Sequence, residues 1–196
     1  MRTWNFYTAK ELHPEGWVRR QLEIQAKGLS GNLDKVWRDV RDSAWIGGTA
    51  EGWERVPYWL DGFIPLAYLL DNKDMIARAQ TYVDAILAQQ KPSDWICPCD
   101  EDKIPGYDSW AVQLISKVLV VCYECSGDER IPEALYRVLK NYYDLLKTIL
   151  KAYGTAPTMI GAVPFLLELD TSREPHYIRM NVRRISSKLK CWRDND

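Results

Sequence analysis

Residues 52–70, GWERVPYWLDGFIPLAYLL, decide the fold that we expect for this chain. Pro57 suits the first turn of a helix, where a backbone N–H has no intrahelical partner. From Tyr58 to Leu70 the residues are apolar on nearly every face of a helix, which is typical of a helix buried on all sides. The stretch therefore predicts an interior helix of an all-α domain.

Two helical hairpins follow one another along the sequence. After the turn at residues 71–74, an apolar stripe with helical spacing predicts a partner helix with one wet face. A mostly apolar helix at residues 110–125, the turn at 126–129 and a second striped helix repeat the pair after about fifty residues. The stripes consist of Ile76, Ala79, Val83, Ile86 and Leu87, and of Ile131, Leu135, Val138, Tyr142 and Leu145.

The N-terminal region is also predicted to be helical. Val18, Leu22 and Leu29 form a stripe that only Gln25 interrupts, which predicts a helix over about residues 14–28. A short helix is expected over residues 33–41, before the Gly47-Gly48 pair. Because wholly buried helices alternate with half-wet ones, antiparallel hairpins in an α/α toroid are favoured over an open solenoid.

Composition limits the partners of the chain. Its 196 residues are 46% apolar and 12% aromatic, which is enough for a sizeable core. A net charge of −1 and a pI near 6.2 give no field that attracts nucleic acid or an anionic membrane. The sequence has no signal peptide and no run of about 18 apolar residues, so we expect a soluble, cytoplasmic chain without a membrane partner.

One local basic segment, RMNVRRISSKLKCWR at residues 179–193, contains no acidic residue. A basic helix of this kind can contact RNA, but a solvated surface is the commoner role of such a charge run. We therefore expect no nucleic-acid partner.

The hairpin sequences resemble a known family. GWERVPYWLDG is followed by DNKDMIARAQTYVDAILAQQ at residues 71–90, Trp95-Ile96, YDSW at residues 107–110 and SGDERIPEAL at residues 126–135. Over about residues 16–148 this order is similar to glycoside hydrolase family 127, the β-L-arabinofuranosidase-like family. The resemblance implies the N-terminal part of an (α/α)6 barrel that releases arabinofuranose or related sugars from plant-type glycans.

In that family a zinc-held cysteine is the nucleophile and a glutamate is the general acid/base. These segments lie further along the barrel than this chain runs, so the resemblance assigns no catalytic residue here. Six hairpins would need about 300 residues. We expect residues 1–150 to be a partial barrel that can self-associate through its open edge. Residues 151–196, with Pro157, Pro164 and Pro175, are expected to be an atypical tail of a truncated or frame-altered chain.

Loops at the starts of inner helices commonly line the cup of such a toroid. Aromatic faces there can stack on sugars, and charged groups can hold hydroxyls. The bland alternatives are that Trp53 and Trp59 belong to the core, that Glu54 and Arg55 form an ion pair, and that Asp108 caps a helix, which we favour over sugar contact. The candidate substrate-binding residues are Trp53, Glu54, Arg55, Tyr58, Trp59, Asp61, Tyr107, Asp108 and Trp110.

Glycosidases need two carboxyl groups at a defined separation. Glu51, Glu54, Asp61 and Asp108 could supply such a pair, but the sequence cannot give the separation, and we assign none of them as a catalytic acid.

Four of the five cysteines, Cys97, Cys99, Cys122 and Cys125, match the ligand count of a zinc site. The second pair lies inside an apolar helix, where a buried cysteine more often acts as a small hydrophobe. We therefore expect no metal or other cofactor in this chain. The predicted function is a glycoside hydrolase-like protein that lacks its nucleophile. The alternative is a non-catalytic helical module that binds glycans or proteins.

Overall fold

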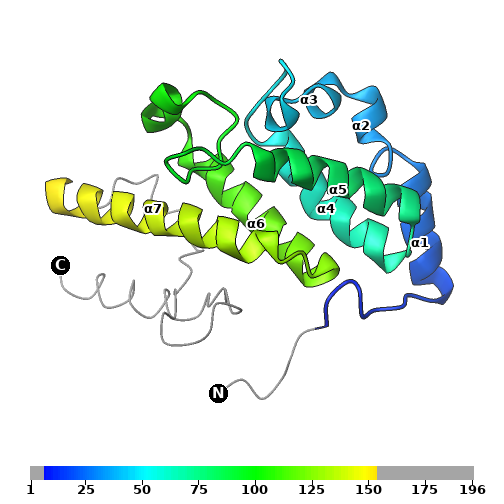
Figure 1. Cartoon of the computed structure of the whole chain (residues 1–196). Helices are drawn as coiled ribbons and strands as arrows, with labels where there is room; N and C mark the ends of the chain where they lie inside the picture. The colour runs from blue at the N-terminus through cyan, green and yellow to red at the C-terminus, as the bar shows by residue number, and fades with distance from the viewer. Residues whose placement is uncertain (1–6, 154–196) are drawn as a thin grey trace, which may run out of the picture. The chain divides into compact units, whose positions relative to one another are not determined.

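The computed structural model describes residues 7–153, and side chains as far as residue 141. The expectations for the tail and for the basic segment at 179–193 lie outside these residues, as does the fifth cysteine, Cys191. The described elements are helical, and the β-bridges Ser43–Ala50 and Gln90–Ile96 are isolated, so the prediction of an all-α fold is confirmed. The elements are α1 (Gly16–Lys27), α2 (Leu33–Val36), α3 (Arg38–Arg41), η1 (Ala44–Ile46), α4 (Arg55–Leu69), α5 (Lys73–Ala88), η2 (Glu101–Gly106), α6 (Ser109–Ser126) and α7 (Arg130–Tyr153), shown in Figure 1.

The chain forms two compact units, Met1–Ile131 and Pro132–Asp196. In the second unit, Leu135 and Val138 are buried whereas Tyr136 is 42% exposed, so this part of α7 has one apolar and one wet face as its stripe predicts. Tyr142 and Leu145, the last residues of that stripe, lie beyond the described side chains.

In the first unit, both predicted hairpin turns are present, and each contains a residue that caps the end of a neighbouring helix. Asn72 begins α5 by accepting a hydrogen bond from the Met75 N–H at 3.1 Å. Gly127 ends α6 in the left-handed conformation, with φ of 74°, and its N–H returns to the Tyr123 carbonyl. Local side-chain and glycine chemistry therefore fixes where these helices begin and end.

Helices α4 and α6 are parallel neighbours, and the contacts between them have nearly the same offset in sequence. Tyr107 bonds Gly52 across 55 residues, and Lys117 bonds Asp61 across 56 residues. Equivalent positions in the first helices of the two predicted hairpins therefore contact each other.

Helix α4 is not buried on all sides, so that expectation is wrong for the described chain. Its exposed residues, Arg55, Tyr58 and Gly62, follow at spacings of three and four and therefore share one face. The opposite face contains Leu60 and Ile64, which are fully buried. The sequence pattern misses the open face because tyrosine and glycine count as compatible with a core.

Helix α6 fits its prediction better. Of its residues, only Glu124 is exposed.

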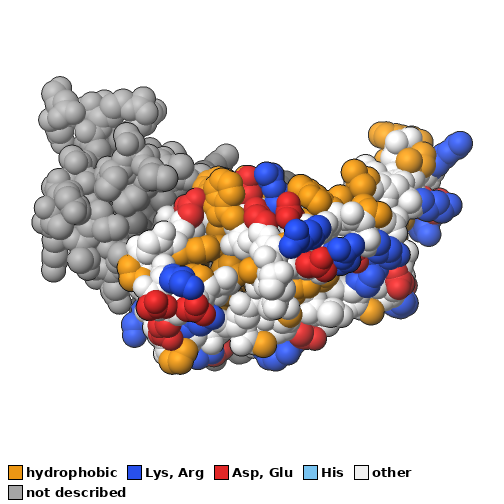
Figure 2. Space-filling model, turned by 90° about the horizontal axis from the view of Figure 1, so that it is seen from above, with side chains coloured by type: hydrophobic (Ala, Val, Ile, Leu, Met, Phe, Trp, Pro, Cys, Tyr) orange, Lys and Arg blue, Asp and Glu red, His pale blue; other side chains and the backbone are white. Residues whose placement is uncertain are grey.

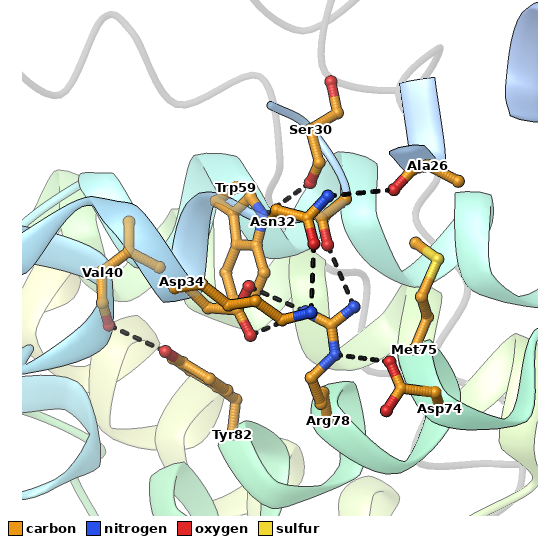
Figure 3. A network of polar contacts seen from close by, with 12 residues as sticks. Ala26, Ser30, Asn32, Asp34, Val40, Trp59, Asp74, Met75, Arg78 and Tyr82 are labelled. Carbon is orange, nitrogen blue, oxygen red and sulfur yellow. Dashed lines mark hydrogen bonds and ion pairs between the residues drawn. The ribbon is translucent and has the colours of Figure 1, made fainter. Parts of the chain in front are cut away.

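The segment before α4 is attached by the polar network drawn in Figure 3. Arg78 of α5 donates to both carboxylate oxygens of Asp34 and to the carbonyl of Gly31. Tyr82 donates to the Val40 carbonyl at 2.9 Å, and its burial raises its pKa to about 12. Although the sequence pattern places Arg78 on the wet side of α5, its side chain is in fact 20% exposed and joins α5 to α2.

The two N-terminal helices differ in part from their predictions. Helix α1 forms where expected, but none of its residues is buried, and Trp17 and Val18 are 78% and 40% exposed. The single helix expected over residues 33–41 is divided into α2 and α3, because Trp37 between them has extended backbone angles. Within residues 7–153, none of the helices has the length and apolar character needed to cross a membrane.

Candidate ligand-binding surface at the start of α4

The loop before α4 is organised by Glu51. Its carboxylate accepts hydrogen bonds from the backbone N–H groups of Trp53, Glu54 and Arg55 at 3.1, 3.2 and 3.3 Å. The Ser43 hydroxyl donates to the Glu51 carbonyl at 2.6 Å. Glu51 thus satisfies free N–H groups at the start of α4, a role that the N-cap residue Glu54 does not fill with its own side chain.

Trp53 is held on both its main chain and its side chain. The Trp45 indole donates to the Trp53 carbonyl at 2.7 Å, and the Trp53 indole donates to Asp108 at 2.8 Å. The residue is nevertheless 41% exposed. Because the indole N–H is the only polar group of a tryptophan side chain, the part of Trp53 that faces solvent is apolar ring surface.

Gly52 and Tyr107 fix the same loop from the side of α6. The Tyr107 hydroxyl donates to the Gly52 carbonyl at 2.6 Å, and burial raises the pKa of this phenol. A Cβ atom on Gly52 would lie 2.8 Å from the Ala44 Cβ atom and 3.1 Å from the Pro98 side chain. The close approach therefore requires glycine at this position.

Arg55 lies between an aromatic ring and two carboxylates. Its guanidinium carbon is 5.6 Å from the centre of the Trp37 ring, within the range of a cation–π contact. Its nitrogens are 3.6 Å from Glu54 and 3.9 Å from Glu51, which are ion-pair distances rather than hydrogen bonds. The side chain is 45% exposed, so it retains N–H groups that a ligand can use.

Tyr58 follows Arg55 on the open face of α4 and is 51% exposed. We call the group Trp37, Trp53, Glu54, Arg55 and Tyr58 the α4 entry surface.

Other predicted site residues lie elsewhere. Trp59 is 7% exposed, stacks on Phe63 with ring centres 4.4 Å apart, and donates its indole N–H to the Ser30 carbonyl. Trp59 therefore belongs to the core and does not line the surface. Asp61 is paired with Lys117 at 2.6 Å, and Trp110 is half-buried at the start of α6.

Asp108 caps α6, as we expected. Its Oδ1 atom accepts the Trp110 N–H at 2.9 Å while Oδ2 holds the Trp53 indole.

The four candidate carboxylates differ in how fully they are engaged by hydrogen bonds and ion pairs. Glu51 caps α4, Asp61 pairs with Lys117, and Asp108 binds both Trp53 and Trp110. Glu54 is the least occupied, since it contacts the Arg55 guanidinium only at 3.6 Å. Glu51, Asp61 and Asp108 therefore accept hydrogen bonds within the described chain, whereas Glu54 has only a longer ion-pair contact.

The four described cysteines are free thiols. Burial is the main reason why the pKa of Cys97 is raised to about 12 and the pKa values of Cys122 and Cys125 are raised to about 11. Among residues 7–141, no three histidine, cysteine or acidic side chains gather as a metal site would need. Cys97, Cys122 and Cys125 are buried, whereas Cys99 is half-buried.

Acidic and basic side chains are interspersed on the face shown in Figure 2, and hydrophobic side chains are exposed between them. Such a surface offers no broad field of one sign to a highly charged polymer.

Sequence reasoning did not find the contributions of Trp37 and Lys117. Trp37 precedes α3 and is 18 residues before Arg55 in the sequence. The two side chains meet because the chain between them folds back, which no local sequence signal indicates. The Lys117–Asp61 pair could have been found by aligning the two hairpins at an offset of 56 residues.

The chain matches no protein-family model, and neither the curated proteins nor the solved structures contain a match to it.

Proposed function

We propose that the α4 entry surface binds carbohydrate, as one wall of a glycosidase-like α/α toroid for plant-type glycans that contain arabinofuranose. The observation that carries the proposal is the exposure of three aromatic side chains: Trp37, which contacts Arg55, and Trp53 and Tyr58, which are two and three residues from Arg55 in the sequence. Trp37, Trp53 and Tyr58 are 38%, 41% and 51% exposed, and Arg55 is 45% exposed between two carboxylates. Exposed aromatic rings next to partly exposed charged groups are typical of a ligand surface rather than of a solvated helix end.

The chemistry of the surface suits a sugar. An aromatic ring can stack on the C–H face of a sugar, and Arg55 and Glu54 can donate to and accept from neighbouring hydroxyls. Around the entry of α4, Glu51, Glu54, Asp61 and Asp108 outnumber the cations Arg55 and Lys117. Like charges at an interface are unfavourable, so a neutral sugar is favoured over a uronic acid.

Two features support the toroid. Helices α4 and α6 are parallel, and residues that contact each other between them are 55 or 56 positions apart, as expected for neighbouring inner helices of such a fold. The resemblance to family 127 assigns neither the nucleophile nor the general acid/base to a residue of this chain. The carboxylates of Glu51, Asp61 and Asp108 already accept hydrogen bonds within the chain. We therefore propose that the described residues bind the glycan and do not catalyse its hydrolysis.

Calorimetry with neutral arabinofuranose oligosaccharides tests the proposal. Wild-type chain should release heat without hydrolysing the sugar, and Trp53→Ala or Tyr58→Ala should weaken binding by about tenfold. Trp17→Ala is the matched control, because Trp17 is 78% exposed but lies on α1. No heat with any neutral plant oligosaccharide would overturn the proposal, and turnover by the chain would overturn the non-catalytic role.

Self-association is the second candidate function. It is favoured by the exposed apolar side chains of α1, among them Trp17, Val18 and Ile24. Sedimentation of the wild-type chain should then depend on concentration, and Trp17→Ala should reduce that dependence without affecting sugar binding.

A further inference from the structure

We infer that Asp108 is a positioning residue that holds the Trp53 ring in a fixed orientation for ligand contact. The inference rests on the proposed function, because it explains how that surface is preorganised. It adds a role to Asp108 beyond that of a helix cap.

The two oxygens of Asp108 have different partners. Oδ1 accepts the backbone N–H of Trp110 at 2.9 Å, and Oδ2 accepts the Trp53 indole N–H at 2.8 Å. The first bond ties the carboxylate to the rigid start of α6. The second transfers that rigidity to a side chain 55 residues earlier in the sequence.

The loop that carries Trp53 is fixed by separate contacts. Trp45 binds the Trp53 carbonyl, Tyr107 binds the Gly52 carbonyl, and Glu51 accepts the Trp53 N–H. The backbone of Trp53 is thus held without Asp108. What Asp108 adds is control of the side chain, which is 41% exposed and would otherwise choose among rotamers in solvent.

A fixed ring should bind a ligand more tightly than a mobile one. Ordering a flexible side chain on binding is unfavourable, and the Asp108 bond removes that cost before the ligand arrives. The effect expected for one side chain is about a two- to tenfold change in affinity.

Asp108→Asn separates the two roles of the carboxylate. Asparagine is as good a helix cap as aspartate, so its oxygen can keep the bond to the Trp110 N–H. Its amide group then faces the Trp53 indole with a donor, and two donors cannot bond each other. The substitution should therefore release the ring while leaving α6 capped.

The test follows the indole N–H of Trp53 in ¹⁵N-tryptophan spectra of the full chain, which has nine tryptophans. Trp53→Phe identifies the resonance. In Asp108→Asn this N–H should exchange faster with solvent, and affinity for the neutral arabinofuranose oligosaccharide should fall by about two- to tenfold. Asp128→Asn is the matched control, because Asp128 likewise accepts a backbone N–H two residues on, from Arg130 at 3.1 Å.

Two results would overturn the inference: unchanged exchange of the Trp53 indole in Asp108→Asn, or faster exchange with unchanged affinity. Failure of the wild-type chain to bind sugar would instead overturn the proposed function and, with it, the ligand role of the ring. Exchange would still show whether Asp108 holds Trp53, so the two failures are distinguishable.

Discussion

Arg78 donates from its Nη1 atom to both carboxylate oxygens of Asp34 at 2.8 Å, and this pair joins α5 to α2 across 44 residues of sequence. The pair is largely shielded from solvent, since the side chains are 20% and 9% exposed. The guanidinium also lies 5.0 Å from the centre of the Phe63 ring. Arg78 thus helps to attach the N-terminal segment to the hairpin, together with Tyr82, which donates to the Val40 carbonyl.

Arg78→Ala should lower the free energy of unfolding by about 3–5 kcal/mol, because it leaves the carboxylate of Asp34 buried without its partner. Urea unfolding followed by circular dichroism measures the change. The matched control is Lys73→Ala, whose ion pair with Asp71 is 81% and 78% exposed and should contribute less than about 1 kcal/mol. Equal effects of the two substitutions would contradict the buried role of Arg78.

Truncation of Trp59 should destabilise the chain more than truncation of Trp53. Trp59→Ala should destabilise the chain by about 3–5 kcal/mol, because the ring is buried against Phe63 and Tyr82. Trp53→Ala should cost about 1 kcal/mol, because it removes one hydrogen bond from a part-exposed ring. Thermal unfolding separates the two. A larger loss for Trp53 would place it in the core rather than on the α4 entry surface.

Gly52→Ala should be destabilising by about 1–3 kcal/mol, since the new methyl group would meet Ala44 and Pro98 within 3.1 Å and push the loop away. Gly62→Ala provides the control in α4. No atom outside the helix lies within 4 Å of its Cβ position, so the higher helix propensity of alanine should stabilise the chain by about 0.5–1 kcal/mol. Denaturant midpoints of the two variants should move in opposite directions, and a stabilising Gly52→Ala would refute the close approach.

The Cys97 thiol should make stability fall at high pH. Burial raises its pKa from 9.0 to about 12, so between these values the unfolded chain loses a proton that the folded chain keeps. The contribution of Cys97 is fully present below about pH 9 and is lost as the pH rises toward 12, by at most about 1.4 kcal/mol per pH unit. Urea unfolding between pH 8 and 11 should give a flatter profile for Cys97→Ala than for wild type. Parallel profiles would contradict the shift.

Most of the helices could be predicted from the sequence because their signals are local. The stripe of α5, its Asn72 cap and the glycine that ends α6 act within one or two turns of chain. The approximate repeat could also be predicted, because apolar helices and polar turns recur along the chain. Burial was less predictable: the same apolar character describes Trp59 in the core and Tyr58, which is 51% exposed.

The sequence is enough to predict an all-α chain of repeated hairpins with aromatic and charged residues at the starts of the more apolar helices. It does not predict which of these side chains contact one another. Trp53 and Asp108 are 55 residues apart, and Trp37 reaches Arg55 through two short helices and a loop. Periodicity reports which face of a helix is apolar, whereas contacts between helices depend on their register and on the path of the loops. Register and loop path depend on packing throughout the unit. Here they leave Tyr58 exposed on α4, bury Trp59 in the core and pair Asp61 with Lys117.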